Sequence, residues 1–466
     1  MHHETPDQLV GAAPCTASAG RPTAAQRLDR LPASSFHRRM ALMIGLGLFF
    51  DGFDLYMASS IMPALAATGW ADLHANALFA SAGALGGLIG AFFAGWLGDR
   101  HGRKFSFQFN LVLFGSMSLA AAFAPSMQWL IVLRFLMSIG LGAEVVVGYA
   151  TIAEFVPPAS RGRWCAILFF VGTASLLAST VVGYIVIPHL GWRWMFAIAG
   201  MGGLLVWIMR KDMPESPRWL ELVGRWQEAD RILDSIEAEI ASGTGQTLPP
   251  LAPTSAALHS RFITRDLFRA PILRSSLIGI LLNVVAFSSL YGFIIWLPTF
   301  LVKQGLAVQT SLGHTALISA GSLIGVFCAG LLTDRWSRKH WVVLSAVVSA
   351  ALGYAYIHAG SLEATTLVGI ALIASLYLGT TMGWSTYVPE LFPTELRLRG
   401  TGISSVAGRA VSILAPQAMT LLYAFNGVNA VVYTLMGLLV MQAILVAAFG
   451  IQTNGQVLDA QFTGVQ

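Results

Sequence analysis

Long apolar runs alternate with short polar segments along most of the chain. Each run is close to the roughly 20 apolar residues that a helix needs to cross a bilayer. The runs lack the strict alternation of a barrel strand, and only helices or closed barrels satisfy the backbone within lipid. The pattern predicts an all-α membrane protein with twelve transmembrane helices, at residues 40–66, 76–98, 105–124, 128–152, 164–188, 192–209, 274–301, 312–333, 340–359, 363–388, 400–424 and 427–450.

The composition agrees with this prediction. Of the 466 residues, 55% are hydrophobic and only 11% are charged, whereas about 25% of the residues of a soluble protein are charged. Most of the chain therefore cannot face water. The net charge of +5 does not indicate nucleic-acid binding, because the basic residues fall in short loops and one central segment and do not form a continuous face.

The positions of the 28 lysines and arginines predict the orientation in the membrane. With the N-terminus inside, the outside loops carry only Arg193 and Lys303. The positive-inside rule then places both termini in the cytoplasm of a multi-pass protein of the inner or plasma membrane. The predicted organisation is a tail at 1–39, a six-helix half at 40–209, a cytoplasmic loop at 210–273, a second six-helix half at 274–450 and a tail at 451–466.

Two motifs recur at nearly the same interval. The segment GWLGDRHGRK, which starts at Gly95, returns as GLLTDRWSRK 235 residues later. The pattern Glu-x-x-Pro-x-x-x-Arg runs from Glu154 to Arg161 and returns 236 residues later, from Glu390 to Arg397. Two repeats in the same order indicate two halves with the same orientation, which is the parallel repeat of an alternating-access transporter.

The central loop carries a further helical signal. Ser216 and Pro217 have the residue types of an N-cap followed by the first helical position. The charged, amphipathic sequence RWLELVGRWQEADRILDSIEAE follows, and it predicts a cytoplasmic helix and not a span.

Five charged residues lie within the predicted spans, namely Asp51, Asp54, Arg134, Glu144 and Arg409. Charges in lipid are costly and by default functional. Counted at about 1.5 Å per residue from the cytoplasmic side, Asp54 and Arg134 reach similar depths, so the two can pair. Such a pair either couples protonation to movement or is a permanent structural ion pair. Asp51 and Glu144 could each serve in coupling or in structure.

The segment GWLGDRHGRK resembles the signature loop between the second and third helices of the major facilitator superfamily. In this interpretation Asp99 lies at the N-terminus of a neighbouring helix and pairs with Arg103, latching one conformation. The alternative is a plain basic loop. The second copy departs from the first, with Ser337 in place of Gly102. The candidate latch residues are Gly95, Asp99, Arg100, Gly102, Arg103, Glu154 and Arg161, and then Asp334, Arg335, Arg338, Glu390 and Arg397.

Shorter motifs resemble particular branches of that superfamily. GFD at Asp54 and LRFLMSIGLG at Arg134 look like the acid and arginine of proton-coupled sugar porters, as does PESPRWL. DGFD looks like the motif of aromatic acid/proton symporters. GLGAE, GFIIWLPTFL, YVPELFPTELR and AGRAVSILAP look like nicotinate-type metabolite transporters. The glutamine pair of sugar porters is missing before Asn283, so the chain resembles the organic acid/proton symporters more closely.

This resemblance implies that Arg409 faces the cavity and binds a carboxylate through charge-assisted hydrogen bonds. The alternative is an ion pair from Arg409 to Asp51 or Glu144. Tyr149, Tyr291 and Trp384 are candidates for substrate contact, although most aromatic residues of membrane helices pack or lie at interfaces.

The sequence contains no nucleophile–base set, nucleotide loop or cysteine spacing for a metal. We therefore expect no enzyme activity, metal or cofactor, and an ion gradient as the source of energy. The predicted function is proton-coupled symport of a small organic acid, such as an aromatic or pyridine carboxylate, by a monomer whose partners are substrate, protons and the bilayer, without nucleic acid. The alternatives are an exporter or carrier of neutral or cationic molecules, sugar or drug-like, and a transporter-like sensor.

Overall fold

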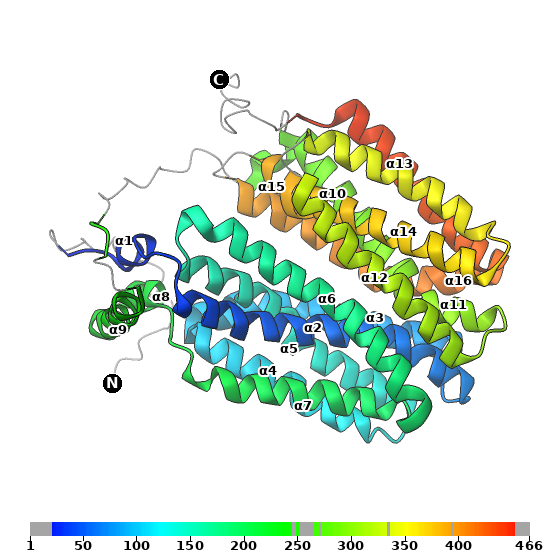
Figure 1. Ribbon diagram of the computed structural model, residues 1–466, viewed down its shortest axis with the longest axis horizontal. Coiled ribbons are helices and arrows are strands. Elements are labelled where there is room, and N and C mark those ends of the chain that lie inside the picture. The colour runs from blue at the N-terminus through cyan, green and yellow to red at the C-terminus, as the bar shows by residue number, and fades with distance from the viewer. Residues whose placement is uncertain are drawn as a thin grey trace, which may run out of the picture.

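The computed structural model shows a bundle of long helices, two of which carry short π-helical segments (Figure 1). It describes residues 21–244, 248–251, 264–269, 272–332, 336–392 and 396–452. Ten helices in these ranges are long and apolar enough to cross a membrane. The 17-residue helix α7 is a further, shorter span. The 53-residue helix α16 is broken at Asn426 and Gly427, so it supplies two spans. The predicted twelve-helix fold is therefore confirmed.

The first half contains six of these spans. They are α2 (Ser35–Ala67), α3 (Leu73–His101), α4 (Arg103–Ala122), α5 (Met127–Phe155), α6 (Pro158–Leu190) and α7 (Arg193–Met209). Side-chain caps begin two of them. Asp72 accepts a hydrogen bond from the Ala75 amide at the start of α3, and Ser126 accepts one from the Trp129 amide at the start of α5. These caps satisfy backbone donors that have no partner within the helix.

The second half repeats this arrangement. Its spans are α10 (Ile272–Ser289) with the π-helix η4 (Leu290–Ile294) and α11 (Leu297–Lys303), then α12 (Val308–Leu332), α13 (Arg338–Ile357), α14 (Leu362–Thr380) with the π-helix η5 (Thr381–Tyr387) and α15 (Val388–Glu390), and α16 (Arg397–Phe449). Gly427 has a φ of +59°, a conformation that glycine adopts without strain, and this allows the sharp break within α16.

Three short helices lie together beyond one end of the bundle, next to the start of α2 (Figure 1). They are α1 (Ala24–Asp29), α8 (Pro217–Leu222) and α9 (Trp226–Thr244). We call this end the α9 end and the opposite one the far end. The single amphipathic helix predicted here is divided into α8 and α9 at Gly224, which has a φ of +80°. The predicted N-cap is confirmed, because the Ser216 side chain accepts a hydrogen bond from the Trp219 amide.

The apolar residues of α9 explain why this helix stays at the bundle. Leu233, Ile236 and Ile240 are buried and belong to one hydrophobic cluster with Leu28 of α1 and Phe155 of α5. The charged residues of α9 lie on its other faces. The helix therefore packs its apolar face against the α9 end of the first half.

Candidate functional site

A cavity of about 260 Å³ lies between the two halves near the middle of the bundle. The first half contributes residues of α2, α3, α5 and α6 to its walls, and the second half contributes residues of α10, η4, α14, η5 and α16. Most of the lining is apolar. The charged and large polar residues that line it are Asp51, Asp54, Tyr56, Arg134, Tyr149, Tyr291, Tyr377, Trp384 and Arg409.

The predicted pairing of Asp54 with Arg134 is present at this cavity. Nη1 of Arg134 lies 2.5 Å from Oδ2 of Asp54, and Nη2 donates to the Asp54 carbonyl oxygen at 3.2 Å. The two side chains are only 1% and 3% exposed. Gly83 of α3 makes room for the arginine, since a Cβ atom there would lie 2.8 Å from Arg134 Nε. The guanidinium also lies over the Phe79 ring, 5.2 Å from its centroid.

Asp51 and Arg409 face the same cavity from opposite halves, and both are half-buried. Within the described residues, no acid–base contact of 4.0 Å or less involves either side chain. Of the two alternative partners for Arg409, Asp51 is therefore not in direct contact with it. The other, Glu144, does not line the cavity. Arg409 therefore faces the space between the halves without a direct ion pair in the described part of the chain, and Asp51 acts on it only at longer range.

Glu144 instead forms a second buried ion pair, with Arg210. Nη1 of Arg210 lies 2.5 Å from Oε1 of Glu144, and the side chains are 0% and 1% exposed. Nε and Nη2 of Arg210 donate to the carbonyl oxygens of Met43 and Ile44, at 2.9 and 3.1 Å. A Cβ atom on Gly47 would lie 2.0 Å from Arg210 Nη2 and 2.2 Å from Glu144 Oε1, so only glycine leaves space for the pair.

The sequence analysis placed Arg210 at the start of the central loop, and α7 does end at Met209, but it did not foresee the burial of the Arg210 side chain. This residue starts the 3₁₀ turn Arg210–Asp212 directly after α7, and its side chain is fully buried. Sequence reasoning missed it because a basic residue at the end of an apolar run looks like a topology signal. Depth counting does not suggest its partner either, since Glu144 lies eleven residues before the end of α5.

Two aromatic pairs border the cavity. The rings of Tyr291 and Phe287 are stacked, with centroids 6.1 Å apart and an interplanar angle of 5°. Trp384 of the second half contacts Phe169 of the first, with centroids 6.0 Å apart. Tyr149 also lines the cavity, so all three candidate aromatic residues reach it.

The π-helices η4 and η5 carry Tyr291 and Trp384. Such segments are rare and are found often at functional sites. The apolar pattern of these spans did not predict them, because the spans are apolar on most faces and a local shift in helical phase leaves no visible mark in such a sequence.

The candidate latch gathers at the α9 end of the first half. Arg103 donates to Asp99 at 2.9 Å and pairs with Glu154 at 2.9 Å. Asp99 itself is 77% exposed and does not occupy a helix N-terminus. Glu215 lies at the N-terminus of α4 instead, where its carboxylate accepts hydrogen bonds from the backbone amides of Arg103 and Lys104. Burial raises the pKa of Glu215, against the effect of these hydrogen bonds.

Other latch candidates are placed less closely together. Arg338 pairs with Glu390 at 2.9 Å, so the second half has its own contact at the same end. Arg100 lies over the Trp96 ring, and Gly102 has a φ of +93° at the junction of α3 and α4. Arg161 and Arg397 begin their helices, and Gly95 lies within α3. Asp334 and Arg335 lie outside the described residues.

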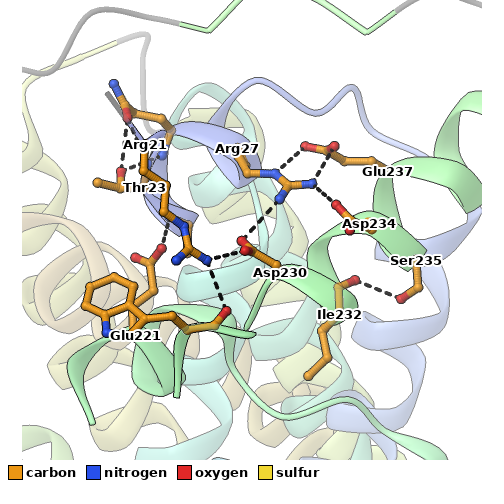
Figure 2. Close-up of polar contacts among 12 residues, drawn as sticks. Arg21, Thr23, Arg27, Glu221, Asp230, Ile232, Asp234, Ser235 and Glu237 are labelled. Carbon is orange, nitrogen blue, oxygen red and sulfur yellow. Dashed lines mark hydrogen bonds and ion pairs between the residues drawn. The ribbon is translucent and has the colours of Figure 1, made fainter. Parts of the chain in front are cut away.

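An N-terminal arm, residues 21–31, crosses α9 and is held there by ion pairs that the sequence did not predict (Figure 2). Arg27 contacts Asp234 at 2.6 Å and Glu237 at 2.7 Å, and Arg21 pairs with Asp230. Burial alone would raise the pKa of Glu237, but hydrogen bonds from two arginines hold it below the usual range. The hydrogen bond from Arg21 lowers the pKa of Asp230.

Comparisons with known proteins agree with this architecture. Residues 44–416 match the family described as Major Facilitator Superfamily. The chain is 36% identical over 432 residues to the inner membrane metabolite transport protein YdjE of Escherichia coli (strain K12), covering 92% of this chain and 96% of the relative. It is 31% identical over 440 residues to the niacin transporter NiaP of Acinetobacter baylyi, covering 93% and 98%. The xylose transporter XylE from E. coli, in an inward-open conformation, has the same fold, with a TM-score of 0.70, 20% identity and coverage of 91% and 98%.

Proposed function

Because the chain belongs to the major facilitator superfamily of membrane transporters, we propose that it carries a small aromatic or pyridine carboxylate across the membrane together with a proton. The observation that carries this proposal is the charge pattern of the cavity. Asp54 and Arg134 neutralise each other there, while Arg409 makes no direct contact with an acid among the residues that the structure describes. An anionic substrate can supply that direct contact.

Arg409 is the proposed anchor for the carboxylate. Its planar guanidinium can donate two parallel hydrogen bonds to a carboxylate, a geometry that lysine cannot reproduce. Each hydrogen bond to a charged group contributes about 1.5–3 kcal/mol. The stacked pair of Tyr291 and Phe287 and the pair of Trp384 and Phe169 offer apolar walls for a flat ring. The name of the niacin transporter relative supports a ring of this size.

Asp54 is the proposed proton carrier. Protonation removes its negative charge, which breaks the attraction to Arg134 and frees a guanidinium inside the cavity. Because Asp54 lines the cavity, a proton can reach it from water on whichever side the cavity is open. Asp51 lies one helical turn away on the same wall and is a second candidate for this role. We assign Glu144 to structure, since it is sealed against Arg210.

The α9 end is the proposed cytoplasmic side. The N-terminal arm, the central-loop helices and the basic loop at Arg103 all lie at this end (Figure 1). The positive-inside rule places such segments in the cytoplasm. The network of Arg103 with Asp99, Glu154 and Glu215 would then hold together the cytoplasmic ends of α3, α4 and α5, and it would act as a latch for one conformation.

A second candidate is a carrier of cationic solutes. Asp51 favours it, because this acid also faces the cavity and, among the described residues, no arginine lies within 4.0 Å of its carboxylate. The two candidates differ in the charge that the cavity selects, so a panel of anionic, neutral and cationic solutes separates them.

Transport into proteoliposomes tests the proposal. Purified protein is reconstituted, and uptake of labelled nicotinate, benzoate, 4-hydroxybenzoate, xylose and a small aromatic amine is measured with and without an imposed proton gradient. We expect carboxylates to accumulate when the outside is acidic. Arg409→Ala should raise the half-saturation concentration by about 10- to 150-fold, corresponding to about 1.5–3 kcal/mol.

Arg163→Ala is the matched control, because Arg163 is an exposed arginine at the start of α6, outside the cavity lining. It should leave uptake unchanged. Carboxylate uptake that ignores the proton gradient, or a panel in which only the amine or the sugar accumulates, would contradict the proposal.

A further inference from the structure

Two tyrosines, one from each half, meet between the helices. The hydroxyl of Tyr56 in α2 lies 2.8 Å from the hydroxyl of Tyr377 in α14, and this hydrogen bond is buried. Both rings line the cavity. The contact joins residues that are 321 positions apart in the chain. It is therefore a direct bond between the two bodies that must move against each other when a transporter of this family alternates its access.

The tyrosine pair lies on the far side of the cavity. Along the helix formed by α14 and η5, Tyr377 is seven residues from Trp384 toward the far end, which is about 10 Å. Along α2, Tyr56 is closer to the far end than Asp51 and Asp54. Along these two helices, Asp51, Asp54 and Trp384 thus lie between the tyrosine pair and the α9 end.

Other contacts between the halves agree with this placement. Ser81 of α3 donates to the Ile413 carbonyl oxygen of α16 at 2.8 Å, again toward the far end of both helices. A Cβ atom on Gly313 of α12 would lie 3.1 Å from the Tyr184 ring of α6, near the same end. On the α9 side of the cavity, the ring contact between Phe169 and Trp384 is apolar and carries no hydrogen bond.

We propose that the hydrogen bond between Tyr56 and Tyr377 is the gate that closes the cavity toward the far end. To open that end, the two halves must separate where the hydroxyls meet. Both hydroxyls then exchange this hydrogen bond for bonds to water, and the net stabilisation of one buried hydrogen bond is lost. The bond therefore favours the far-end-closed conformation. This gate does not depend on the identity of the substrate or on proton coupling.

Tyrosine-to-phenylalanine substitutions test the gate, because they remove the hydroxyl and keep the ring. Spin labels are attached at Thr68→Cys and Gln304→Cys in full-length protein whose own cysteines are replaced by serine. Thr68 and Gln304 are exposed and follow α2 and α11 at the far end. Their separation is measured by pulsed electron paramagnetic resonance. We expect Tyr56→Phe and Tyr377→Phe each to increase the ratio of long to short distances by about two- to tenfold.

The double variant distinguishes a lost bond from general loosening. If one hydrogen bond is responsible, Tyr56→Phe with Tyr377→Phe has an effect no larger than either single change, because each removes the same contact and the double variant leaves no buried hydroxyl unpaired. Tyr356→Phe is the matched control, since Tyr356 is a buried tyrosine of α13 that does not line the cavity. It should leave the distance distribution unchanged. An unchanged distribution in both single variants, or strictly additive effects in the double variant, would overturn the gate.

Discussion

The first half of the molecule contains two ion pairs that look alike and lie in different surroundings. Asp54–Arg134 and Glu144–Arg210 both have a closest nitrogen–oxygen distance of 2.5 Å, and no member is more than 3% exposed. Each also lies against a glycine that leaves space for the arginine. The difference is that Asp54 and Arg134 line the cavity between the halves, whereas Glu144 and Arg210 do not.

This difference separates an ion pair that can open and close during transport from an ion pair that can only stabilise the fold. Burial by itself does not show that an ion pair stabilises a protein, because desolvation offsets the attraction. Whether water or substrate can reach the ion pair decides whether it can open. At the cavity, water or substrate can replace a lost partner, so the bond can open and close. Around Glu144, the carbonyl oxygens of Met43 and Ile44 hold Nε and Nη2 of Arg210 in place. If the pair opened, the Glu144 carboxylate would be left without a counterion in a buried site.

The largest effect on stability is expected from opening the sealed pair. Arg210→Met leaves the Glu144 carboxylate buried without a partner, which should destabilise the fold by about 3–5 kcal/mol. The double variant Glu144→Leu with Arg210→Met removes both charges and should recover most of that loss. Thermal unfolding in detergent measures both. A double variant as unstable as the single one would show that the charge pair itself, and not charge burial, is what the fold requires.

Asp54→Asn should impair transport and leave the stability of the fold almost unchanged. The change keeps the shape of the side chain and leaves Arg134 next to a hydrated cavity, so we expect the midpoint of thermal unfolding to stay close to that of the unmodified protein. Accumulation driven by a proton gradient should fall by at least about 100-fold, because the carboxylate that binds the proton is gone. Uptake assays on the stable protein measure this. Retention of proton-driven accumulation would move the coupling site to Asp51.

Sequence patterns predicted the spans and the pairing of Asp54 with Arg134, but they did not predict the pairing of Glu144 with Arg210. The apolar runs revealed twelve spans, and depth counting along straight helices brought Asp54 and Arg134 together. The same counting failed for Glu144, because a long arginine side chain reaches back from the end of α7 through the space that Gly47 leaves open. Such a contact depends on how three helices approach each other, and hydropathy along the chain contains no information on that.

At the α9 end, too, local sequence patterns predicted individual helices but not the contacts between distant segments. Charge patterning identified an amphipathic segment after Pro217, and a cap was visible in Ser216. The N-terminal arm was assigned to a tail, because a six-residue helix such as α1 has no detectable hydrophobic period of its own. Its docking on α9 depends on pairs between residues about 200 positions apart, such as Arg27 with Glu237.

Substitutions of Gly47 and Gly83, which lie against the two arginines, should have smaller effects and test the same difference between the two ion pairs. Gly47→Ala would place Cβ 2.0 Å from Arg210 Nη2 and force the sealed pair apart, and we expect a loss of about 1–3 kcal/mol in unfolding free energy. Gly83→Ala would place Cβ 2.8 Å from Arg134 Nε, at a side chain that the cavity gives room to move. It should alter transport more than stability. Thermal unfolding and uptake, measured on both variants, check the contrast; equal loss of stability would contradict it.

The ion pairs of the N-terminal arm, which range from exposed to partly buried, should show the smallest and most salt-dependent effect. The pKa values of Asp230 and Glu237 are lowered in the folded state. Their contribution is therefore present above the unfolded pKa values of about 4 and is lost as pH falls through the lower folded values. Each pair contributes only a few tenths of a kcal/mol to about 1 kcal/mol, and salt weakens it. Hydrogen exchange of residues 21–31 should increase below about pH 4, or at 1 M salt near neutral pH, while the buried pairs stay intact.

The most direct measurement compares the two pairs in one assay. Proteoliposomes containing the unmodified protein, Asp54→Asn or Glu144→Leu with Arg210→Met are loaded with a transported carboxylate, and both exchange at equal pH and accumulation driven by a proton gradient are recorded. We predict that Asp54→Asn keeps exchange and loses accumulation, while the double variant keeps both. Accumulation that survives in Asp54→Asn and disappears in the double variant, with exchange intact, would contradict the account.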